Sequence, residues 1–311
     1  MKMSSSPLVY IIVLNWNNPD DTIECLASLE LLHTENIVIV VVDNGSTDGS
    51  IRLIKTEFPE VMLIETKQNL GFAGGMNVGV CHALEQNAEF VLLLNNDTVA
   101  HANMLNHMLE HADDDIGLIA PVIFYFDEPS RVWSSGGGFN EWTLEMTGGH
   151  GRNQFLPDSA IERGFLSGCA WLISRNTFEN VGLLDERFFM YYEDLDFCLR
   201  VREAGYRLIL VPKAHLWHKV SQSTGGEINP TERYYMALSS VMYFRKHMRG
   251  VQILLIPLYR FLSALRWTLK LITKQEWTSL AAYWRGLFMG WSAKRRQASS
   301  LSLGKMSDTG C

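Results

Sequence analysis

The sequence is poor in cysteine and lacks a long apolar run. Its five cysteines are odd in number and widely spaced, and no CxxC pair occurs, which argues against a disulfide framework and a structural zinc site. No stretch of about 20 apolar residues occurs, so we expect no membrane-spanning helix, and we expect no signal peptide at the start. With 47% hydrophobic and 20% charged residues, the chain has the composition of a globular protein.

Positive charge is scarce in most of the chain and concentrated near its end. Residues 1–244 hold 15 Lys and Arg against 32 Asp and Glu, whereas residues 245–296 hold 11 Lys and Arg against the single acid Glu276. An acidic body with a basic, aromatic C-terminal segment indicates two surfaces with different partners. Nucleic acid is not expected as a partner, because the body is acidic and carries no recognition motif.

Apolar, β-branched runs alternate with segments of helical spacing in the first part of the chain. This alternation predicts a mostly parallel, doubly wound, Rossmann-like sheet flanked by helices. Strands are expected at residues 8–15, 37–43, 61–65, 90–95 and 117–124, and helices at 20–32, 49–57, 76–86 and 101–112. Ligands of such sheets bind at the carboxyl ends of the strands, where Asp43, Asn69–Gly71 and Asn95–Asp97 fall.

The second half is less regular. We expect a strand at 165–174, a helix at 193–204, an extended segment at 206–217 and a loop at 219–229. Helical spacing resumes from about 231 to 297. The predicted division is therefore a catalytic domain over 1–230 and a basic, aromatic helical region over 231–311.

Two strand ends carry acids suited to a nucleotide ligand. Asp43, in VVDNGSTDGS, either caps a strand–turn–helix joint or accepts hydrogen bonds from a nucleobase or ribose. Asp97, in Asn95–Asn96–Asp97, is either a turn cap or a ligand for Mg²⁺ or Mn²⁺, which needs only one or two protein carboxylates when it bridges a diphosphate.

Two further motifs suggest proton transfer and metal binding. Glu193, Asp194 and Asp196 begin a predicted helix, where the dipole favours acids, but an ionised carboxylate there also suits a general base. His215 and His218 would lie on opposite sides of a strand, so they do not form a paired site. Either could complete a metal shell begun by Asp97, and we favour His218 because it ends the extended segment.

Taken in order, these segments resemble bacterial glycosyltransferase family 2, in its rhamnosyltransferase-like branch. The resemblance covers about residues 8–220 and rests on YIIVLNWN, VVDNGSTDGS, KQNLGFAGGMN, LLLNND, SGCAWLISR and FFMYYEDLDFCLRVREAGYRLILVPKAHLWH. It implies the A-type glycosyltransferase fold, here with a C-terminal helical extension, and inversion at the anomeric carbon.

The resemblance also implies residue roles. Asp194 would be the general base, supported by Glu193, while Asp97 would bind Mg²⁺ or Mn²⁺ and His218 would reach the metal or the diphosphate. Asn95 stands where the family's DxD motif begins with Asp, a departure that weakens the expected metal affinity. The donor pocket would be formed by Asn15, Asp43, Asn44, Asn69, Gly71, Phe72, Asn77, Asn95 and Asn96.

The predicted function is transfer of a sugar, with rhamnose as the branch suggests, from a dTDP- or UDP-sugar to a saccharide or lipid-linked saccharide in cell-surface polysaccharide assembly. Trp267, Trp277, Trp284 and Trp291 among basic residues suggest contact with an anionic membrane surface. We therefore expect a cytoplasmic protein, peripheral on the inner face of the cytoplasmic membrane. Packing of these helices on the catalytic domain or in a homo-oligomer is the alternative.

Two other functions compete with transfer. A sugar nucleotidyltransferase usually carries a basic glycine-rich loop near its N-terminus, but residues 14–21 (LNWNNPDD) contain no Lys or Arg. A catalytically silent carbohydrate- or nucleotide-binding relative would have no need of Asp97, Glu193 and Asp194 together. Turnover of a donor distinguishes such a relative from an active transferase.

Overall fold

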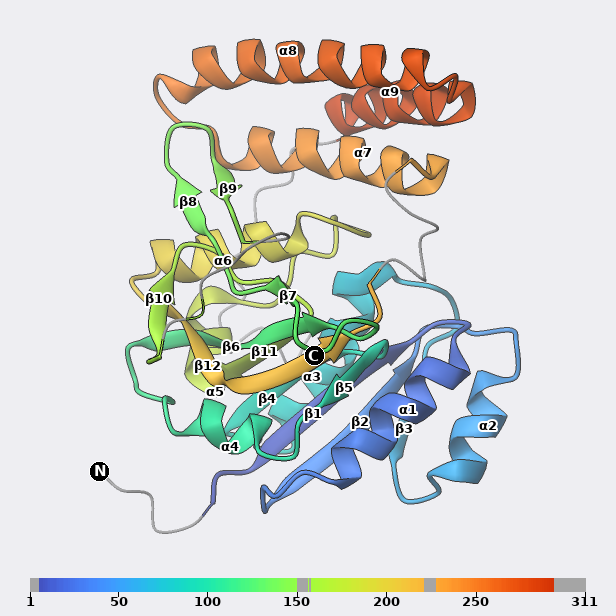
Figure 1. Cartoon of the computed structure of the whole chain (residues 1–311), viewed down its shortest axis with the longest axis vertical. Helices are drawn as coiled ribbons and strands as arrows, with labels where there is room; N and C mark the ends of the chain where they lie inside the picture. Colours follow the sequence, from blue (N-terminus) through green and yellow to red (C-terminus); the bar gives the residue numbers. More distant parts are fainter. Residues whose placement is uncertain (1–5, 150–155, 157, 221–227, 294–311) are drawn as a thin grey trace.

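A computed structural model describes residues 6–149, 156, 158–220 and 228–293 of the chain (Figure 1). The first part alternates strands and helices as the sequence predicts. Its elements are β1 (Val9–Asn15), α1 (Pro19–Glu30), β2 (Ile37–Asp43), α2 (Ser50–Glu57), β3 (Met62–Glu65), α3 (Gly71–Glu85) and β4 (Phe90–Asn95). Helix α3 begins at Gly71, within the glycine-rich loop, five residues before the predicted start at 76.

The middle of the chain differs more from the prediction. The helix expected at 101–112 is shortened to α4 (Met104–Leu109), and β5 (Thr98–Ala100) precedes it. Only Ala170–Ser174 (β11) of the strand expected at 165–174 is extended. Most of the loop predicted at 219–229 lies outside the described residues. The other elements are β6 (Ile116–Tyr125), β7 (Val132–Ser134), β8 (Gly138–Asn140), β9 (Glu145–Thr147), β10 (Ile161–Arg163), α5 (Arg175–Val181), α6 (Glu193–Glu203) and β12 (Arg207–His218).

The central sheet has the strand order β10-β12-β6-β11-β4-β1-β2-β3. Strands β1, β2, β3 and β4 pair in parallel, as do β6 and β12. Strand β11 lies antiparallel between β4 and β6. The carboxyl ends of β1, β2 and β4 therefore meet at one edge, which places Asn15, Asp43 and Asn95 together.

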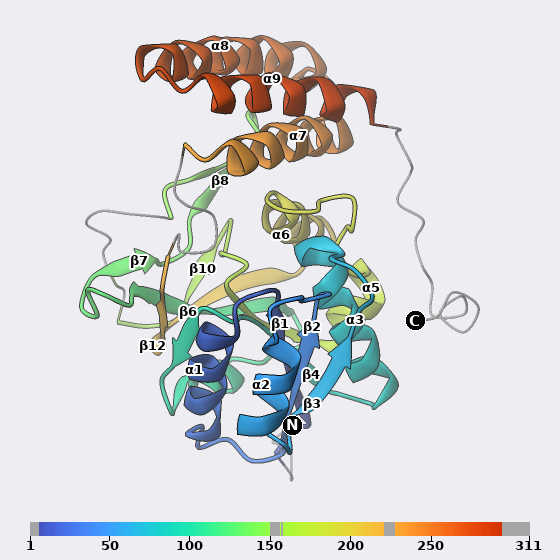
Figure 2. The ribbon, with the colours of Figure 1, turned by 90° about the vertical axis from the view of Figure 1, so that its right-hand side faces the viewer.

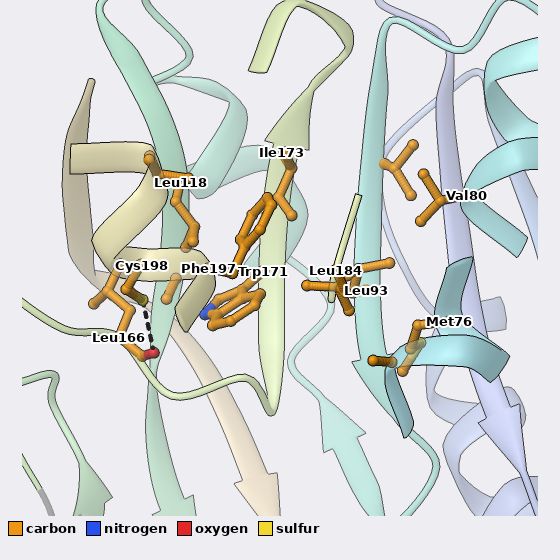
Figure 3. Packing of buried hydrophobic residues seen from close by; sticks show 14 of the residues in the cluster. Met76, Val80, Leu93, Leu118, Leu166, Trp171, Ile173, Leu184, Phe197 and Cys198 are labelled. Atoms are coloured by element: carbon orange, nitrogen blue, oxygen red, sulfur yellow. Dashed lines mark hydrogen bonds between the residues drawn. The ribbon is translucent and has the colours of Figure 1, made fainter. Parts of the chain in front are cut away.

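Helices cover both faces of the sheet. Along β1, Val9, Ile11 and Val13 pack toward α1 and α4, whereas Tyr10 and Ile12 pack toward α3, as expected for alternating side chains. On the α3 and α6 face, Trp171 stacks on Phe197 with ring centroids 5.6 Å apart (Figure 3). The thiol of Cys198 donates to the carbonyl of Leu166 on the same face (Figure 3). This core fixes α6, which carries the acidic motif.

Three further helices form a layer above α6, with α8 furthest from the sheet (Figures 1 and 2). They are α7 (Pro230–His247), α8 (Gln252–Thr273) and α9 (Trp277–Ser292). A Cβ at Gly286 would lie 2.3 Å from the Tyr234 carbonyl oxygen, and one at Gly290 would lie 2.6 Å from that of Leu238. These two glycines let α9 pack closely on α7.

Buried ion pairs attach α7 to the body. Asp196 of α6 is fully buried, and its carboxylate contacts His247 Nε2 at 2.7 Å, Lys246 Nζ at 2.5 Å and Arg200 Nε at 2.8 Å. Lys246 also reaches Asp185 at 2.7 Å. The division at residue 230 stays a prediction, although α7 shares the main core through Tyr243 and Phe244.

Within the described ranges, no helix combines the length and hydropathy needed to cross a bilayer.

Candidate active site

A buried hydrogen-bond network fixes Asp43 at the ends of β1 and β2. Asn15 and Asp43 are paired in register, and Asn15 Nδ2 donates to Asp43 Oδ1 at 2.8 Å. The Ser46 backbone N–H donates to the other carboxylate oxygen at 2.9 Å, and Thr22 Oγ1 donates to Asn15 Oδ1 at 2.8 Å. These bonds hold Asp43 in one orientation, as a ligand-positioning carboxylate requires.

The next segment, Asn69–Gly71, is fastened to Asn44. Asn44 Nδ2 donates to Asn69 Oδ1 at 3.1 Å and to the Gly71 carbonyl at 3.0 Å, while the Leu70 N–H donates to Asn44 Oδ1 at 2.9 Å. Gly71 has φ +75°, and a Cβ there would lie 2.4 Å from the Phe189 carbonyl oxygen. Only glycine fits this position without displacing the backbone.

The side chain of Asn77 joins α3 to the segment before α6. It is buried, and its Nδ2 donates to the Leu184 carbonyl at 2.9 Å and to Glu186 Oε1 at 3.0 Å. Its Oδ1 accepts from the Leu184 N–H at 3.1 Å. Direct contact between Asn77 and a donor stays a prediction, and the bonds seen here give Asn77 a positioning role.

The structure brings Asp97 and His218 together. Asp97 lies in the turn between β4 and β5, and β5 pairs with the end of β12, where His218 stands opposite Thr98. His218 Nε2 lies 3.1 Å from Asp97 Oδ1, and both residues are less than one tenth exposed. The Nε2 of His215, by contrast, is hydrogen-bonded to the Pro212 carbonyl oxygen at 3.0 Å.

Opposite shifts in pKa mark Asp97 and His218 as an ion pair. Burial alone would raise the pKa of Asp97, but the hydrogen bond and charge of His218 hold it below its ordinary value. Burial alone would lower the pKa of His218, but the adjacent Cys169 sulfur and the Asp97 carboxylate hold it well above its ordinary value.

These donors fit a divalent cation that also binds a diphosphate. Asp97 offers a carboxylate, His218 would offer a neutral imidazole once the cation displaces its proton, and the buried Oδ1 of Asn95 has no hydrogen-bond partner among the described residues. No cluster of three or more His, Cys, Asp or Glu suited to a metal occurs in the described part of the chain. A cation held here would therefore depend on substrate oxygens to complete its shell.

Asp194 and Glu193 begin α6 under the C-terminal layer. The carboxylate of Asp194 accepts from the backbone N–H of Leu195 at 2.8 Å and also from that of Gly168. Burial nevertheless raises the pKa of Asp194 to about 6. Burial and the neighbouring Asp194 charge raise the pKa of Glu193 well above its ordinary value. Glu193 Oε2 has no hydrogen-bond partner among the described residues. A carboxylate with a pKa near 6 suits a general base at neutral pH.

The segment Gly168–Cys169 connects the two halves of the site. The Gly168 N–H donates to Asp194, and the Cys169 carbonyl accepts from the Asn95 N–H at 3.0 Å. The Cys169 side chain lies beside His218. Because a Cβ at Gly168 would lie 3.2 Å from Asp194 Cβ, a side chain at this position would crowd the acid.

Sequence reasoning missed three residues of this site. Gly168 and Cys169 stand in the quoted SGCAWLISR, but they showed no chemical pattern of their own. Lys219 follows His218, pairs with Asp21 and Glu24, and its N–H donates to the Asp97 carbonyl at 3.0 Å. Asp196, expected beside the other acids of its motif, instead faces the α7 network.

The fold is α/β, and it places Asp43, Asp97 and Asp194 at or beside strand and helix ends, where enzymes of this architecture bind their ligands. The model of the family described as "Glycosyl transferase family 2" matches residues 10–182. The chain belongs to glycosyl transferase family 2, and it is a glycosyltransferase that moves a sugar from a nucleotide-sugar donor to a saccharide acceptor.

The curated relatives include rhamnosyltransferases. The chain is 30% identical over 228 residues to N-acetylglucosaminyl-diphospho-decaprenol L-rhamnosyltransferase of Mycobacterium tuberculosis, an alignment that covers 64% of this chain and 72% of the relative. It is 24% identical to the dTDP-rhamnosyl transferase RfbF of Shigella flexneri, over 77% of this chain and 80% of the relative. The predicted resemblance is confirmed.

Solved structures confirm the A-type glycosyltransferase fold. The mannosyltransferase PcManGT of Pyrobaculum calidifontis, in complex with GDP-Man and Mn²⁺, superposes with a TM-score of 0.57 at 17% identity, covering 98% of this chain and 81% of that one. TarS of S. aureus, residues 1–349, gives a TM-score of 0.52 at 17% identity, covering 93% of this chain and 75% of that one. At these identities the likeness shows the fold alone.

Proposed function

We propose that the chain is an inverting, metal-dependent glycosyltransferase in which Asp194 is the general base. The observation that carries this proposal is Asp194 at the start of α6, with its pKa raised to about 6, joined through Gly168–Cys169 to the Asp97–His218 pair. Asp194 and the candidate cation site thus contact neighbouring residues of one short segment, Gly168 and Cys169. This supports a reaction in which Asp194 takes the proton of an attacking hydroxyl while the cation stabilises the leaving diphosphate.

Each residue then has a defined task. Asp43, held by Asn15 and Ser46, would position the base or ribose of a dTDP- or UDP-sugar. Asp97 and His218, with Asn95, would hold Mg²⁺ or Mn²⁺, which supplies charge stabilisation for the leaving diphosphate. Asp194 takes the proton of the acceptor hydroxyl, and Glu193 beside it would support the acceptor or the base. No covalent enzyme intermediate is required.

The acceptor side of the proposal is a lipid-linked saccharide at a membrane surface. The outer face of α8 carries exposed apolar side chains at spacings of three or four residues, namely Leu254, Leu258, Phe261, Leu265, Leu269 and Ile272. Trp277, Trp284, Phe288 and Trp291 of α9 are also exposed. This face, together with the excess of Lys and Arg over residues 245–296, suits in-plane binding to an anionic bilayer.

Donor turnover tests the chemistry. Release of nucleoside diphosphate would be measured from UDP-, dTDP- and GDP-sugars, beginning with dTDP-rhamnose, in Mn²⁺ or in EDTA. We expect slow, metal-dependent release from one donor. Equal release in EDTA would contradict metal dependence. Binding without turnover of any donor, with saccharide acceptors present, would support a silent relative.

Vesicle binding tests the membrane face. The double variant Leu258→Gln/Leu265→Gln is expected to lose sedimentation with phosphatidylglycerol vesicles. Leu31→Gln is the matched control, because Leu31 is as exposed as these residues but lies at the end of α1. Two results would assign the apolar face to another partner. One is that the double variant sediments with vesicles as the wild type does, and the other is that the wild type is a dimer whereas the double variant is a monomer.

A further inference from the structure

A cavity of about 420 Å³ lies between the C-terminal layer and the start of α6. Helices α7, α8 and α9 all contribute to its wall, and so does the residue directly before Glu193. The polar and aromatic residues of the wall include Tyr192, Arg233, Arg260, Trp267, Lys270 and Tyr283. The cavity therefore borders the segment that carries the candidate base, although it is separate from the donor pocket at the strand ends.

The cavity wall is positively charged. It contains three cations and one carboxylate, Glu232, and with Glu145, which pairs with Arg260 from outside the wall, a surplus of one positive charge remains. Arg233 and Lys270 lie over the ring of Trp267, with 4.3 Å and 4.2 Å from the cationic group to the ring centroid. Arg260 contributes from α8, where it also bonds Glu145 at 3.1 Å and Ser240 at 3.0 Å.

One buried donor in this wall lacks a partner. Arg233 is only 5% exposed and pairs with Glu232 through one terminal nitrogen, but its Nε has no hydrogen-bond partner among the described residues. A buried charged donor without an acceptor costs free energy. A phosphate oxygen in the cavity would satisfy it with a charge-assisted hydrogen bond.

The wall also contains strained backbone next to the catalytic motif. Tyr191 and Tyr192 have φ +66° and +69°, a left-handed conformation that bulky residues rarely adopt. Strain of this kind persists where the surrounding structure enforces it, often at ligand sites. Here it turns Tyr192 into the cavity wall while the next two residues begin α6.

The outer surface offers a path for a hydrocarbon chain. Arg260, Trp267 and Lys270 lie on the inner side of α8, on the same turns as the exposed apolar row from Leu254 to Ile272. A lipid diphosphate ester combines two negative charges with such a chain. The positive charge of the cavity wall matches the diphosphate, and the adjacent apolar face of α8 matches the hydrocarbon chain.

We propose that this cavity holds the diphosphate of a lipid-linked acceptor, with Arg233, Arg260 and Lys270 as its contacts. The inference rests on the proposed function for the presence of an acceptor site near Asp194. It adds the chemical class of the acceptor's anchor and the residues that bind it.

Binding of two synthetic ligands tests the inference on the full chain. One ligand is decyl N-acetylglucosaminyl diphosphate, and the other is decyl N-acetylglucosaminide, which has the same sugar and chain but no phosphate. Calorimetry is expected to show at least tenfold tighter binding of the diphosphate by the wild-type protein. Equal affinity for the two ligands would overturn the inference.

Variants locate the site. Lys270→Gln and, separately, Arg233→Gln are expected to weaken diphosphate binding about tenfold or more, the loss typical of one charge-assisted hydrogen bond. Lys274→Gln, at the exposed C-cap position directly after α8, is the matched control and is expected to bind as the wild type does. Unchanged affinity in Lys270→Gln, with thermal unfolding confirming its fold, would overturn the inference whether or not the Arg233 variant folds.

Two further arms separate the alternatives. If the cavity binds bilayer headgroups instead, Lys270→Gln will bind phosphatidylglycerol vesicles more weakly than Lys274→Gln does. Its affinity for the diphosphate ligand will then be unchanged, and the inference fails. Donor turnover by the wild type is measured in parallel. If the wild type turns over a donor but binds both synthetic ligands equally, only this inference is overturned. If it prefers the diphosphate ligand but turns over no donor, only the proposed function is overturned.

Discussion

His218 Nε2 lies 3.1 Å from Asp97 Oδ1, so the last residue of β12 contacts the turn that follows β4. The two residues are 121 positions apart in the chain, and the short strand β5 brings them together by pairing with β12. This contact is the structural basis for expecting a divalent cation, because it gathers a carboxylate and an imidazole where a diphosphate would lie.

Replacing the carboxylate of this pair is expected to weaken metal binding. Asp97→Asn keeps the side-chain shape but removes the negative charge, so Mn²⁺ affinity in the presence of nucleoside diphosphate should fall about tenfold or more. Titration calorimetry measures it. Asp115→Asn is the control, because Asp115 pairs with Arg207 at the surface. Equal affinity in wild type and Asp97→Asn would remove Asp97 from the metal site.

Activity is expected to depend on pH through Asp194. Burial raises the pKa of this acid to about 6, and only the ionised form can take a proton. At saturating donor, kcat should therefore rise as pH increases through about 6 and level off above it. The pH profile of kcat measures this, and a profile that is flat between about pH 5 and 7 would contradict the assignment.

The buried network around Asp196 is expected to hold α7 on the body. Burial opposes ionisation, but His247, Arg200 and Lys246 hold the pKa of Asp196 far below its ordinary value. A depressed pKa contributes stability above the unfolded value, near pH 4, and that stability is lost as pH falls further. Asp196→Asn should lower the free energy of unfolding by about 3–5 kcal/mol at neutral pH.

Chemical denaturation measures the effect of Asp196→Asn. The matched control is Glu203→Gln, also on α6, whose exposed pair with Arg249 at 3.4 Å is worth at most about 1 kcal/mol. Similar losses in the two variants would show that the buried network does not attach the helix.

Gly71 is expected to tolerate no side chain. Gly71→Ala adds a Cβ that would lie 2.4 Å from the Phe189 carbonyl oxygen, in addition to the strain of φ +75°. Gly205→Ala shares the strain, at φ +90°, but its Cβ would meet nothing within 4 Å. The Gly205 variant should lose about 1 kcal/mol, and the Gly71 variant should lose clearly more and bind donor nucleotide more weakly. Equal losses would show that the loop adapts.

The strand pattern predicted much of the fold because period and composition are local. The β-branched runs of β1, β2 and β4 needed no tertiary information, and their polar ends indicated the ligand edge. The antiparallel β11 could not be foreseen, because a short buried apolar strand reads the same in either direction. Helix α4 begins three residues later than predicted, at Met104, and the His101 N–H donates to the His215 carbonyl of β12 at 3.2 Å instead.

The sequence could single out Asp97, Asp194 and His218 because a carboxylate or an imidazole carries its own chemistry, and their roles stay predictions. Gly168 and Cys169 act through backbone groups and proximity, which no residue pattern encodes. The partners of Asp196 also required the structure, because three neighbouring acids look alike in sequence until α7 supplies Lys246 and His247 for one of them.

The assignment of Asp194 as the base is tested most directly by comparing the wild type with Asp194→Asn on the donor identified in the turnover panel. We expect kcat to fall about a hundredfold or more, with the dissociation constant for the donor nucleotide unchanged, because the amide keeps the shape and removes only the proton acceptor. A variant that turns over the donor at the wild-type rate would contradict the assignment of Asp194 as the base.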